Sequence, residues 1–257
     1  MDEEKHRYFI KLAYNGRTFH GWQIQKGVPT VQEAINDSLC KLTGEDINVV
    51  GCGRTDTGVH AGCFYAQFDV LKKLDAETLD KMLFRMNQML GSEIAIYSIF
   101  PVDEKNHSRF DAISRTYLYR ISRKKNPFEA DYAYYLFGDI GLDKMNRACE
   151  ILKEYKDFEC FSKVNTQVNT FICDIKHAQW RKEGDMLLFE IRADRFLRNM
   201  VRAIVGTMLD TGMGKCSLEE FRQIIESKDR SEAGYSVPAH GLFLTDVEYP
   251  EGMVPVD

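Results

Sequence analysis

The spacing of apolar residues switches between two periods along this chain, and the order of those switches limits which folds it can adopt. Residues 8–14 alternate with the two-residue period of a β-strand, and residues 30–44 repeat with the 3.6-residue period of a helix. Predicted strands at 47–50, 63–70 and 94–100 and a predicted helix at 75–91 follow. The first hundred residues therefore read strand, helix, strand, strand, helix, strand.

The second half of the chain repeats this order. It is predicted to hold a strand at 115–121, a helix opening at Asp143, a hairpin of 171–181 with 186–194 across a turn at 182–185, helices at 196–210 and 218–226, and a final strand at 242–248. The order β-α-β-β-α-β is that of a ferredoxin-like unit. We therefore predict an α+β fold of two pseudo-symmetric ferredoxin-like halves, residues 1–103 and 104–257, with a mostly antiparallel sheet. The duplication rests on element order alone, because the halves share no repeat at the residue level.

Capping residues support the predicted helix ends. The candidate caps are Thr30 with Glu33, Asp75, and Ser217 with Glu220. Gly44 is predicted to end the first helix, since glycine readily adopts the left-handed conformation found after helices.

The charge balance argues against broad adhesion to nucleic acid. The 257 residues carry a formal net charge of −5, so any nucleic-acid site must be a local basic patch. Seven cysteines show neither a CxxC pair nor zinc-type spacing, which predicts reduced thiols and no metal site. No apolar run approaches the roughly 18 residues that span a bilayer, and the charged start has no targeting pattern. We expect a cytoplasmic protein with no membrane partner.

The loop at residues 51–61 is the strongest candidate for chemistry. It lies between two predicted strands and contains Arg54-Thr55-Asp56 between Gly53 and Gly58. Glycines at these places permit backbone angles closed to other residues, so the loop can project the Asp56 carboxylate. The alternative is an ordinary hairpin turn that is capped by its own aspartate. When this loop is considered by itself, the ordinary turn is the favoured interpretation.

An arginine stripe is predicted on the helix at 196–210. Arg195, Arg198 and Arg202 are spaced i, i+3, i+7 opposite the apolar face, with Gly206 on the same stripe leaving room for a close approach. Such a cluster suits a phosphate backbone or an essential carboxylate. A solvated charged face is the alternative.

An ordered series of motifs resembles the tRNA pseudouridine synthase A family along the whole chain. These motifs are Gly53-Arg54-Thr55-Asp56-x-Gly58-Val59-His60-Ala61, Gly21-Trp22-Gln23-x-Gln25, His107-x-Arg109-Phe110-x-Ala112, Arg115-x-Tyr117-x-Tyr119, Phe196-Leu197-x-x-Met200-Val201-Arg202 and Pro238-Ala239-x-Gly241-Leu242. The resemblance implies the pseudouridine synthase fold and a cofactor-free homodimer. Its substrate would be uridine in the anticodon stem-loop of tRNA, at about positions 38 to 40, flipped out of its stack before reaction.

The resemblance also implies residue roles. Asp56 matches the catalytic nucleophile and Arg202 the arginine that pairs with it. Tyr117 matches the tyrosine packed on the target base, Arg54 the residue that assists base extrusion, and Leu242 a substrate-binding position. Arg109, Arg195 and Arg198 are assigned to RNA binding.

Several of these residues also have ordinary structural explanations. Tyr117 on an alternating strand could be core packing. Trp22 could touch RNA or anchor its loop. His60 and His107 are predicted to be structural hydrogen-bonding groups and receive no catalytic role.

Two other functions compete with the synthase. Doubled ferredoxin-like halves with aromatic residues on strands also suit an RNA-binding module without catalysis. A carboxylate hydrolase of nucleosides or sugars is the third possibility, but that chemistry generally uses a pair of acids, and Asp56 has no acidic neighbour in its loop.

Overall fold

A computed structural model describes residues 5–163 and 169–255 of the chain. The chain divides into two compact units: Met1–Ile113 with Leu244–Asp257, and Ser114–Phe243. The predicted boundary between residues 103 and 104 stays a prediction.

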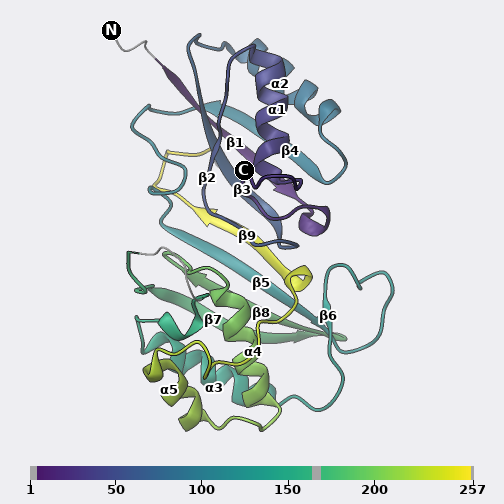
Figure 1. Ribbon diagram of the computed structural model, residues 1–257, viewed down its shortest axis with the longest axis vertical. Helices are drawn as coiled ribbons and strands as arrows, with labels where there is room; N and C mark the ends of the chain where they lie inside the picture. The colour runs from purple at the N-terminus through teal and green to yellow at the C-terminus, as the bar shows by residue number, and fades with distance from the viewer. Residues whose placement is uncertain (1–4, 164–168, 256–257) are drawn as a thin grey trace. The chain divides into compact units, whose positions relative to one another are not determined.

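The first unit has the predicted ferredoxin-like order. Its elements are β1 (His6–Tyr14), a short 3-10 helix (Gly16–Thr18), α1 (Val31–Thr43), β2 (Val50–Gly51), β3 (His60–Val70), α2 (Ala76–Met89), β4 (Ile94–Pro101) and most of β9 (Leu242–Glu248). β1 pairs antiparallel with both β3 and β4, and β2 pairs antiparallel with β3. Helices α1 and α2 lie beside each other, with α2 against β4 (Figure 1).

Local signals account for the helix ends in this unit. The Thr30 side chain accepts from the Glu33 backbone N–H, and Gly44 ends α1 with φ +74°. Asp75 caps α2 by accepting from the Thr78 backbone N–H. Thr30, Gly44 and Asp75 are thus confirmed as the predicted end residues, and of the capping box predicted for Thr30 with Glu33 the structure gives the bond accepted by Thr30.

The predicted strand at 47–50 is wrong in extent, because β2 begins only at Val50. Side chains of α1 form hydrogen bonds with the backbone N–H and carbonyl groups that a longer strand would use for pairing. Asn36 Oδ1 accepts from the Val49 N–H at 3.0 Å, and Gln32 Nε2 donates to the Val49 carbonyl at 2.8 Å. Such long-range side-chain bonds compete with a strand ladder.

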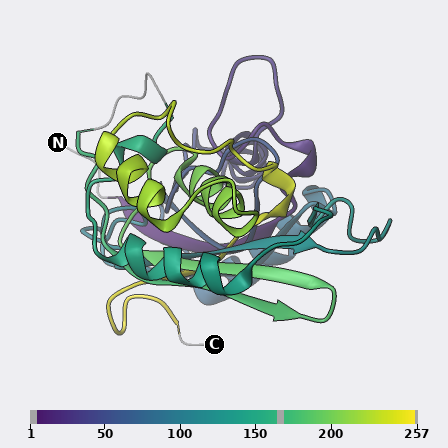
Figure 2. The ribbon, with the colours of Figure 1, turned by 90° about the horizontal axis from the view of Figure 1, so that it is seen from below.

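The second unit again combines a sheet with helices. It contains β5 (Ser114–Ser122), β6 (Tyr134–Tyr135), α3 (Leu142–Lys153), a 3-10 helix (Glu159–Phe161), β7 (Ile175–Glu183), β8 (Met186–Ala193), α4 (Met200–Gly212), α5 (Leu218–Ser227) and a 3-10 helix (Ala239–Gly241). β8 pairs antiparallel with β5 and β7, while β6 runs parallel to β5. Helices α3, α4 and α5 contact one another, and α3 packs against β7 (Figure 2). The predicted α+β class with a mostly antiparallel sheet is confirmed.

The predicted hairpin is present with different limits. β7 begins at Ile175 rather than at residue 171, because residues 171–173 pair with another segment: Phe158 N–H donates to the Phe171 carbonyl, and Cys173 N–H to the Lys156 carbonyl. The predicted turn at 182–185 shortens to two residues, since the last paired residues are Glu183 and Met186.

The predicted helix at 196–210 begins four residues late, at Met200. Asn199 precedes it with φ +68°, a left-handed conformation that a right-handed helix cannot contain. Upstream, the Asp194 carboxylate accepts from the Arg195 N–H and from the Asp174 N–H, both at 2.7 Å. Arg195 and Arg198 therefore precede the helix, and the prediction that they share one helical face with Arg202 is wrong.

Candidate active site

The loop between β2 and β3 carries Asp56. It turns at Thr57-Gly58, where the Val59 N–H donates to the Asp56 carbonyl at 3.1 Å. Gly58 has φ +78°, so the predicted need for glycine holds there. Gly53 lies outside the left-handed region, and a Cβ added to it would meet no atom within 4 Å. The prediction that Gly53 is needed for its backbone angles is therefore wrong.

Residues 14–22 fix this loop from the side of the core. The Tyr14 hydroxyl lies 2.9 Å from Thr55 Oγ1, and the Trp22 N–H donates to the Thr55 carbonyl at 3.2 Å. A Cβ on Gly21, which has φ +89°, would lie 2.5 Å from the same carbonyl. The backbone on either side of Asp56 is thus held by bonds at Thr55 and Gly58, since the Gly58 N–H donates to the Phe19 carbonyl at 3.4 Å.

Trp22 anchors the loop rather than facing solvent. Its side chain is buried, and its ring stacks on Phe64 with centroids 4.2 Å apart. A Cβ on Gly51 would lie 2.6 Å from the indole, so β2 approaches this ring closely. Of the two roles considered for Trp22, the structure favours the anchor.

Both histidines considered from the sequence are hydrogen-bonding groups of the fold. His60 is buried, and its Nδ1 accepts from the Gly16 N–H at 3.1 Å. His107 Nδ1 accepts from the N–H groups of Arg109 and Phe110 at 3.0 and 3.3 Å. Burial lowers the pKa of His107, which favours the neutral form that can accept. Their predicted structural role is confirmed.

Arg54 and Arg109 are the exposed cations of the first unit's candidate site. Arg54 precedes Thr55 on the Asp56 loop. The guanidinium carbon Cζ of Arg109 lies over the ring of the exposed Phe110, 5.6 Å from the ring centroid. Its neighbour Ser108 is buried and donates from Oγ to the Val50 carbonyl at 2.7 Å. This bond places the Arg109 segment beside the strand that leads into the Asp56 loop.

The remaining predicted residues belong to the second unit. Tyr117 on β5 is partly exposed, and its ring meets that of Phe196 edge-on at 5.2 Å, so it is not fully buried core. Arg202 on α4 is partly buried and donates from Nε to the Val237 carbonyl at 2.7 Å. Leu242 is buried at the start of β9. Arg195 is partly buried and Arg198 is exposed, both in the turn before α4.

The structure therefore brings the predicted residues together in two groups. Asp56, Arg54 and Arg109 share the first unit, while Tyr117, Arg195, Arg198, Arg202 and Leu242 share the second. The sequence analysis gave no supporting role to Tyr14 and Gly21, which lie against Thr55 in the Asp56 loop, or to Arg230, which donates to residues 233, 234 and 236. Gly21 belongs to a recognised motif and Tyr14 to a predicted strand, but the residues that they contact are distant in sequence.

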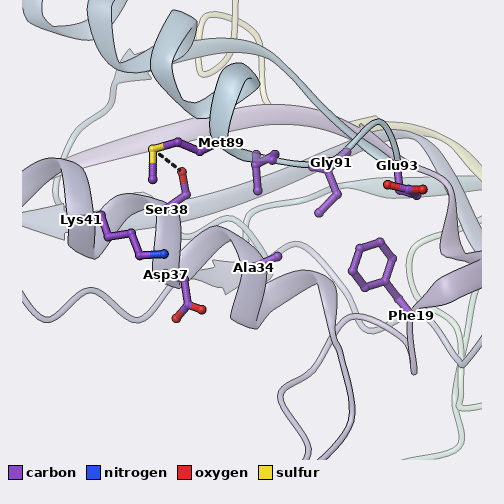
Figure 3. Close-up of a pocket in the computed structure, with 10 residues that line it drawn as sticks. Phe19, Ala34, Asp37, Ser38, Lys41, Met89, Gly91 and Glu93 are labelled. Carbon is purple, nitrogen blue, oxygen red and sulfur yellow. Dashed lines mark hydrogen bonds between the residues drawn. The ribbon is translucent and has the colours of Figure 1, made fainter.

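A cavity of about 370 Å³ in the first unit is separate from these residues (Figure 3). Lys41, Asp37 and Ser38 of α1 line one side, and Phe19 and Glu93 lie on the other. Its charged groups are two carboxylates and one ammonium, and Asp56 does not line it. Phe19 connects the two regions, because its carbonyl accepts from Gly58 in the Asp56 loop.

The described residues contain neither a candidate metal cluster nor a candidate membrane-spanning helix. Within residues 5–163 and 169–255, no group of three or more His, Cys, Asp or Glu side chains is arranged to hold a metal ion. Over the same part of the chain, no helix combines the length and apolarity needed to cross a membrane.

Comparisons with known proteins give concordant matches. Residues 149–250 match a family model described as tRNA pseudouridine synthase. The tRNA pseudouridine synthase A of Parabacteroides distasonis is 50% identical over 254 residues, covering 98% of this chain and 99% of that protein. Its counterpart from Bacteroides thetaiotaomicron is 48% identical, covering 95% and 91%, and that from Francisella tularensis subsp. novicida is 38% identical, covering 95% and 94%. These similarities span nearly the whole chain.

Proposed function

This chain belongs to the tRNA pseudouridine synthase A family, and from that membership we infer that it is an isomerase that forms pseudouridine in tRNA. The family resemblance of the sequence motifs is thereby confirmed. We further propose that its substrate uridines lie in the anticodon stem-loop, at about positions 38 to 40, and that each is flipped out of its stack before reaction.

The reaction defines what the site must supply. The N1–C1′ glycosidic bond breaks, the uracil turns, and a C5–C1′ bond forms; C5 loses its proton and N1 gains one. The oxidation state is unchanged, so the proposed reaction needs no redox cofactor. The detached base must stay bound throughout, and the acting carboxylate must be ionised, which burial alone opposes. An ionised carboxylate on a fixed loop, with an arginine as countercharge, meets these demands.

The observation that carries the proposal is the way the Asp56 loop is held. Thr55 is hydrogen-bonded to both Tyr14 and Trp22, and the Gly58 N–H donates to the Phe19 carbonyl, so the backbone flanking the carboxylate is held at both sides. Positioning a reacting group in this manner supplies a large part of enzymatic rate acceleration. This fixed backbone supports our proposal that Asp56 is the nucleophile.

The other roles follow from chemical type. Arg202 is proposed to supply the countercharge for Asp56, because its Nε is already oriented by the Val237 carbonyl. Tyr117 is proposed to stack on the flipped base, since its ring is partly exposed and supported edge-on by Phe196. Arg54, exposed beside Asp56, is proposed to fill the space that the base vacates, and Leu242 to line the base pocket.

RNA binding is proposed to use a local basic surface. Arg198 and Arg109 are exposed, and Arg195 is partly exposed; these three are the proposed phosphate contacts. A chain of net charge −5 cannot offer a broad basic face, and a homodimer would double the local one. We propose a homodimer acting in the cytoplasm.

Tritium release from tRNA labelled at uridine C5 tests this function, because C5 loses its hydrogen only when it becomes the glycosidic carbon. We expect release by the parent and a loss of at least about 1,000-fold in Asp56→Asn, which keeps the side-chain shape but removes the charge. Asp37→Asn is the matched control, since Asp37 is an exposed carboxylate of the same unit. It should retain the parental rate.

Binding and position measurements complete the test. Both variants should bind tRNA with affinities near that of the parent, and replacement of uridine by cytidine at positions 38 to 40 should remove release from those tRNAs. Tight binding by the parent without release from any tRNA would instead establish a non-catalytic RNA-binding module. Full release by Asp56→Asn would remove Asp56 from the mechanism.

A further inference from the structure

The segment at residues 229–238 follows α5 and lies along α4 without forming a helix or strand. A Cβ on Gly206 would lie 1.8 Å from the Tyr235 carbonyl oxygen. The Gly234 N–H donates to Thr207 Oγ1 at 2.9 Å. The close approach predicted at Gly206 is therefore made by the chain's own backbone.

The same segment sets the orientation of Arg202. Arg202 Nε donates to the Val237 carbonyl at 2.7 Å, and the Val237 N–H donates back to the Arg202 carbonyl at 3.3 Å. The Nε–H lies in the plane of the guanidinium group, so this bond constrains the direction in which the Nη groups point. The position of the Val237 carbonyl thus contributes to where Arg202 presents its charge.

Arg230 holds the residues immediately before that carbonyl. Its Nη1 donates to the carbonyls of Ala233 and Gly234 at 3.2 and 3.1 Å, and its Nη2 donates to Ser236 Oγ at 2.8 Å. One partly buried guanidinium therefore binds three residues of a four-residue stretch. Bonds from a charged donor are about twice as strong as neutral ones, which suits a segment with no ladder of its own.

Asn199 supports the same stretch from the start of α4. It occupies the N-cap position, yet its side chain makes no capping bond to the helix. Its Nδ2 instead donates to Ser236 Oγ at 2.6 Å. Ser236 is thus held by Arg230 and Asn199 together, one residue before the carbonyl that orients Arg202.

We propose that Arg230 and Asn199 are positioning residues for the reaction: they fix residues 233–237 so that the Val237 carbonyl aims Arg202. This inference rests on the proposed role of Arg202 as the countercharge of Asp56. Neither residue needs to touch the RNA, and both act through Arg202. A misplacement of about 1 Å in a catalytic group can cost on the order of 100-fold in rate, so the effect is measurable.

The first test replaces Arg230 with Met and with Lys. We expect Arg230→Met to lower kcat for tRNA about 10- to 100-fold while KM stays within about threefold, since substrate binding is not the affected step. Arg230→Lys should fall between parent and Met, because an ammonium can keep only part of the bonds. Arg222→Met is the matched control: Arg222 is paired with Glu154 in the same unit, and its loss should leave kcat unchanged.

A double-mutant cycle separates positioning from a general structural effect. Lysine at position 202 lacks the in-plane Nε–H, so in an Arg202→Lys background the further change Arg230→Met should alter kcat less than about twofold. If Arg230→Met lowers kcat by the same factor in the Arg202→Lys background as in the parent, the positioning role is overturned. If Arg202→Lys and Arg202→Met keep the full parental rate, the proposed role of Arg202 fails first, and that outcome is distinguishable from the absence of coupling.

Asn199→Gly provides the test if Arg230→Met does not fold. Glycine accepts the left-handed backbone at this position and removes only the bond to Ser236. We expect a fall in kcat, about 3- to 10-fold, that again disappears in the Arg202→Lys background. A fall in kcat of equal size in both backgrounds would contradict the proposal.

Discussion

Gly21 and Gly53 adjoin the same candidate site, yet their surroundings place different demands on them. Gly21 has φ +89° and would bring a Cβ within 2.5 Å of the Thr55 carbonyl. Gly53 adopts no left-handed conformation and has open space around it. Two glycines of the same motif series therefore differ in how much space and backbone freedom their positions require. Of the two, only Gly21 is required by a close backbone approach.

Alanine at these two positions gives a matched comparison. Gly21→Ala should lower the free energy of unfolding by about 2 to 4 kcal/mol, because left-handed strain and a backbone clash add. Gly53→Ala should change it by less than about 0.5 kcal/mol. Urea unfolding monitored by tryptophan fluorescence measures both, and an equal loss in the two variants would contradict this account.

At the residue scale, the sequence could supply candidates only where the chemistry would be carried by the side chain itself, and their roles stay predictions. Asp56 and Arg202 are recognisable from residue type and motif. Arg230 was not recognised, because its significance comes from where residues 233–236 lie after folding, and nothing in its own sequence context distinguishes it from a surface arginine.

At the scale of elements, local capping decided which boundaries were predicted correctly. Ser217 and Glu220 form the complete reciprocal capping box at the start of α5, as their spacing predicted. The predicted start of α4 was wrong because two features outside the helical pattern set it. Asn199 has a left-handed backbone, and the Asp194 carboxylate accepts from the N–H groups of Arg195 and Asp174. A boundary set by bonds between distant segments leaves no periodic signal in the sequence.

The capping box gives an element-level prediction. Ser217→Ala should lower the free energy of unfolding by about 1 kcal/mol, since it leaves a helix N–H without its side-chain acceptor. Ser227 lies at the other end of α5, where its Oγ donates to the Ile224 carbonyl and accepts from the Asp229 N–H but caps no N–H of the first helical turn. Ser227→Ala therefore serves as the control, with an expected change below about 0.5 kcal/mol. Equilibrium denaturation compares them, and equal effects would refute the importance of the box.

At the scale of the whole molecule, the first unit is built from both ends of the described chain. Residues from Leu244 onward belong to it, although the second unit separates them from Ile113. Tyr249 is buried, packs edge-on against Phe9 and Tyr65 at 5.9 and 5.2 Å, and donates its hydroxyl to the Ser108 carbonyl. Element order alone could not predict that the last strand belongs mostly to the first unit, because this depends on which strand the last segment pairs with.

Deletion and substitution test this arrangement. A fragment of residues 1–113 should lack a cooperative unfolding transition, and adding a peptide of residues 244–257 should restore one. A stable fragment of residues 1–103 would instead support the boundary predicted between residues 103 and 104.

In the full chain, Tyr249→Ala should lower the free energy of unfolding by about 3 to 5 kcal/mol. The matched control is Tyr97→Ala, since Tyr97 is 55% exposed, and its cost should stay below about 1 kcal/mol.

The return of the last strand to the first unit also bears on the order in which the protein can mature during translation. Domains generally fold as they leave the ribosome, the N-terminal one first. Here Phe9 and Ser108 emerge early, but Tyr249, which packs on one and bonds the other, emerges only after the entire second unit. A nascent chain stalled before Leu244 therefore holds the Asp56 loop on an unfinished sheet, and only chains translated past that point can complete the unit that presents the carboxylate.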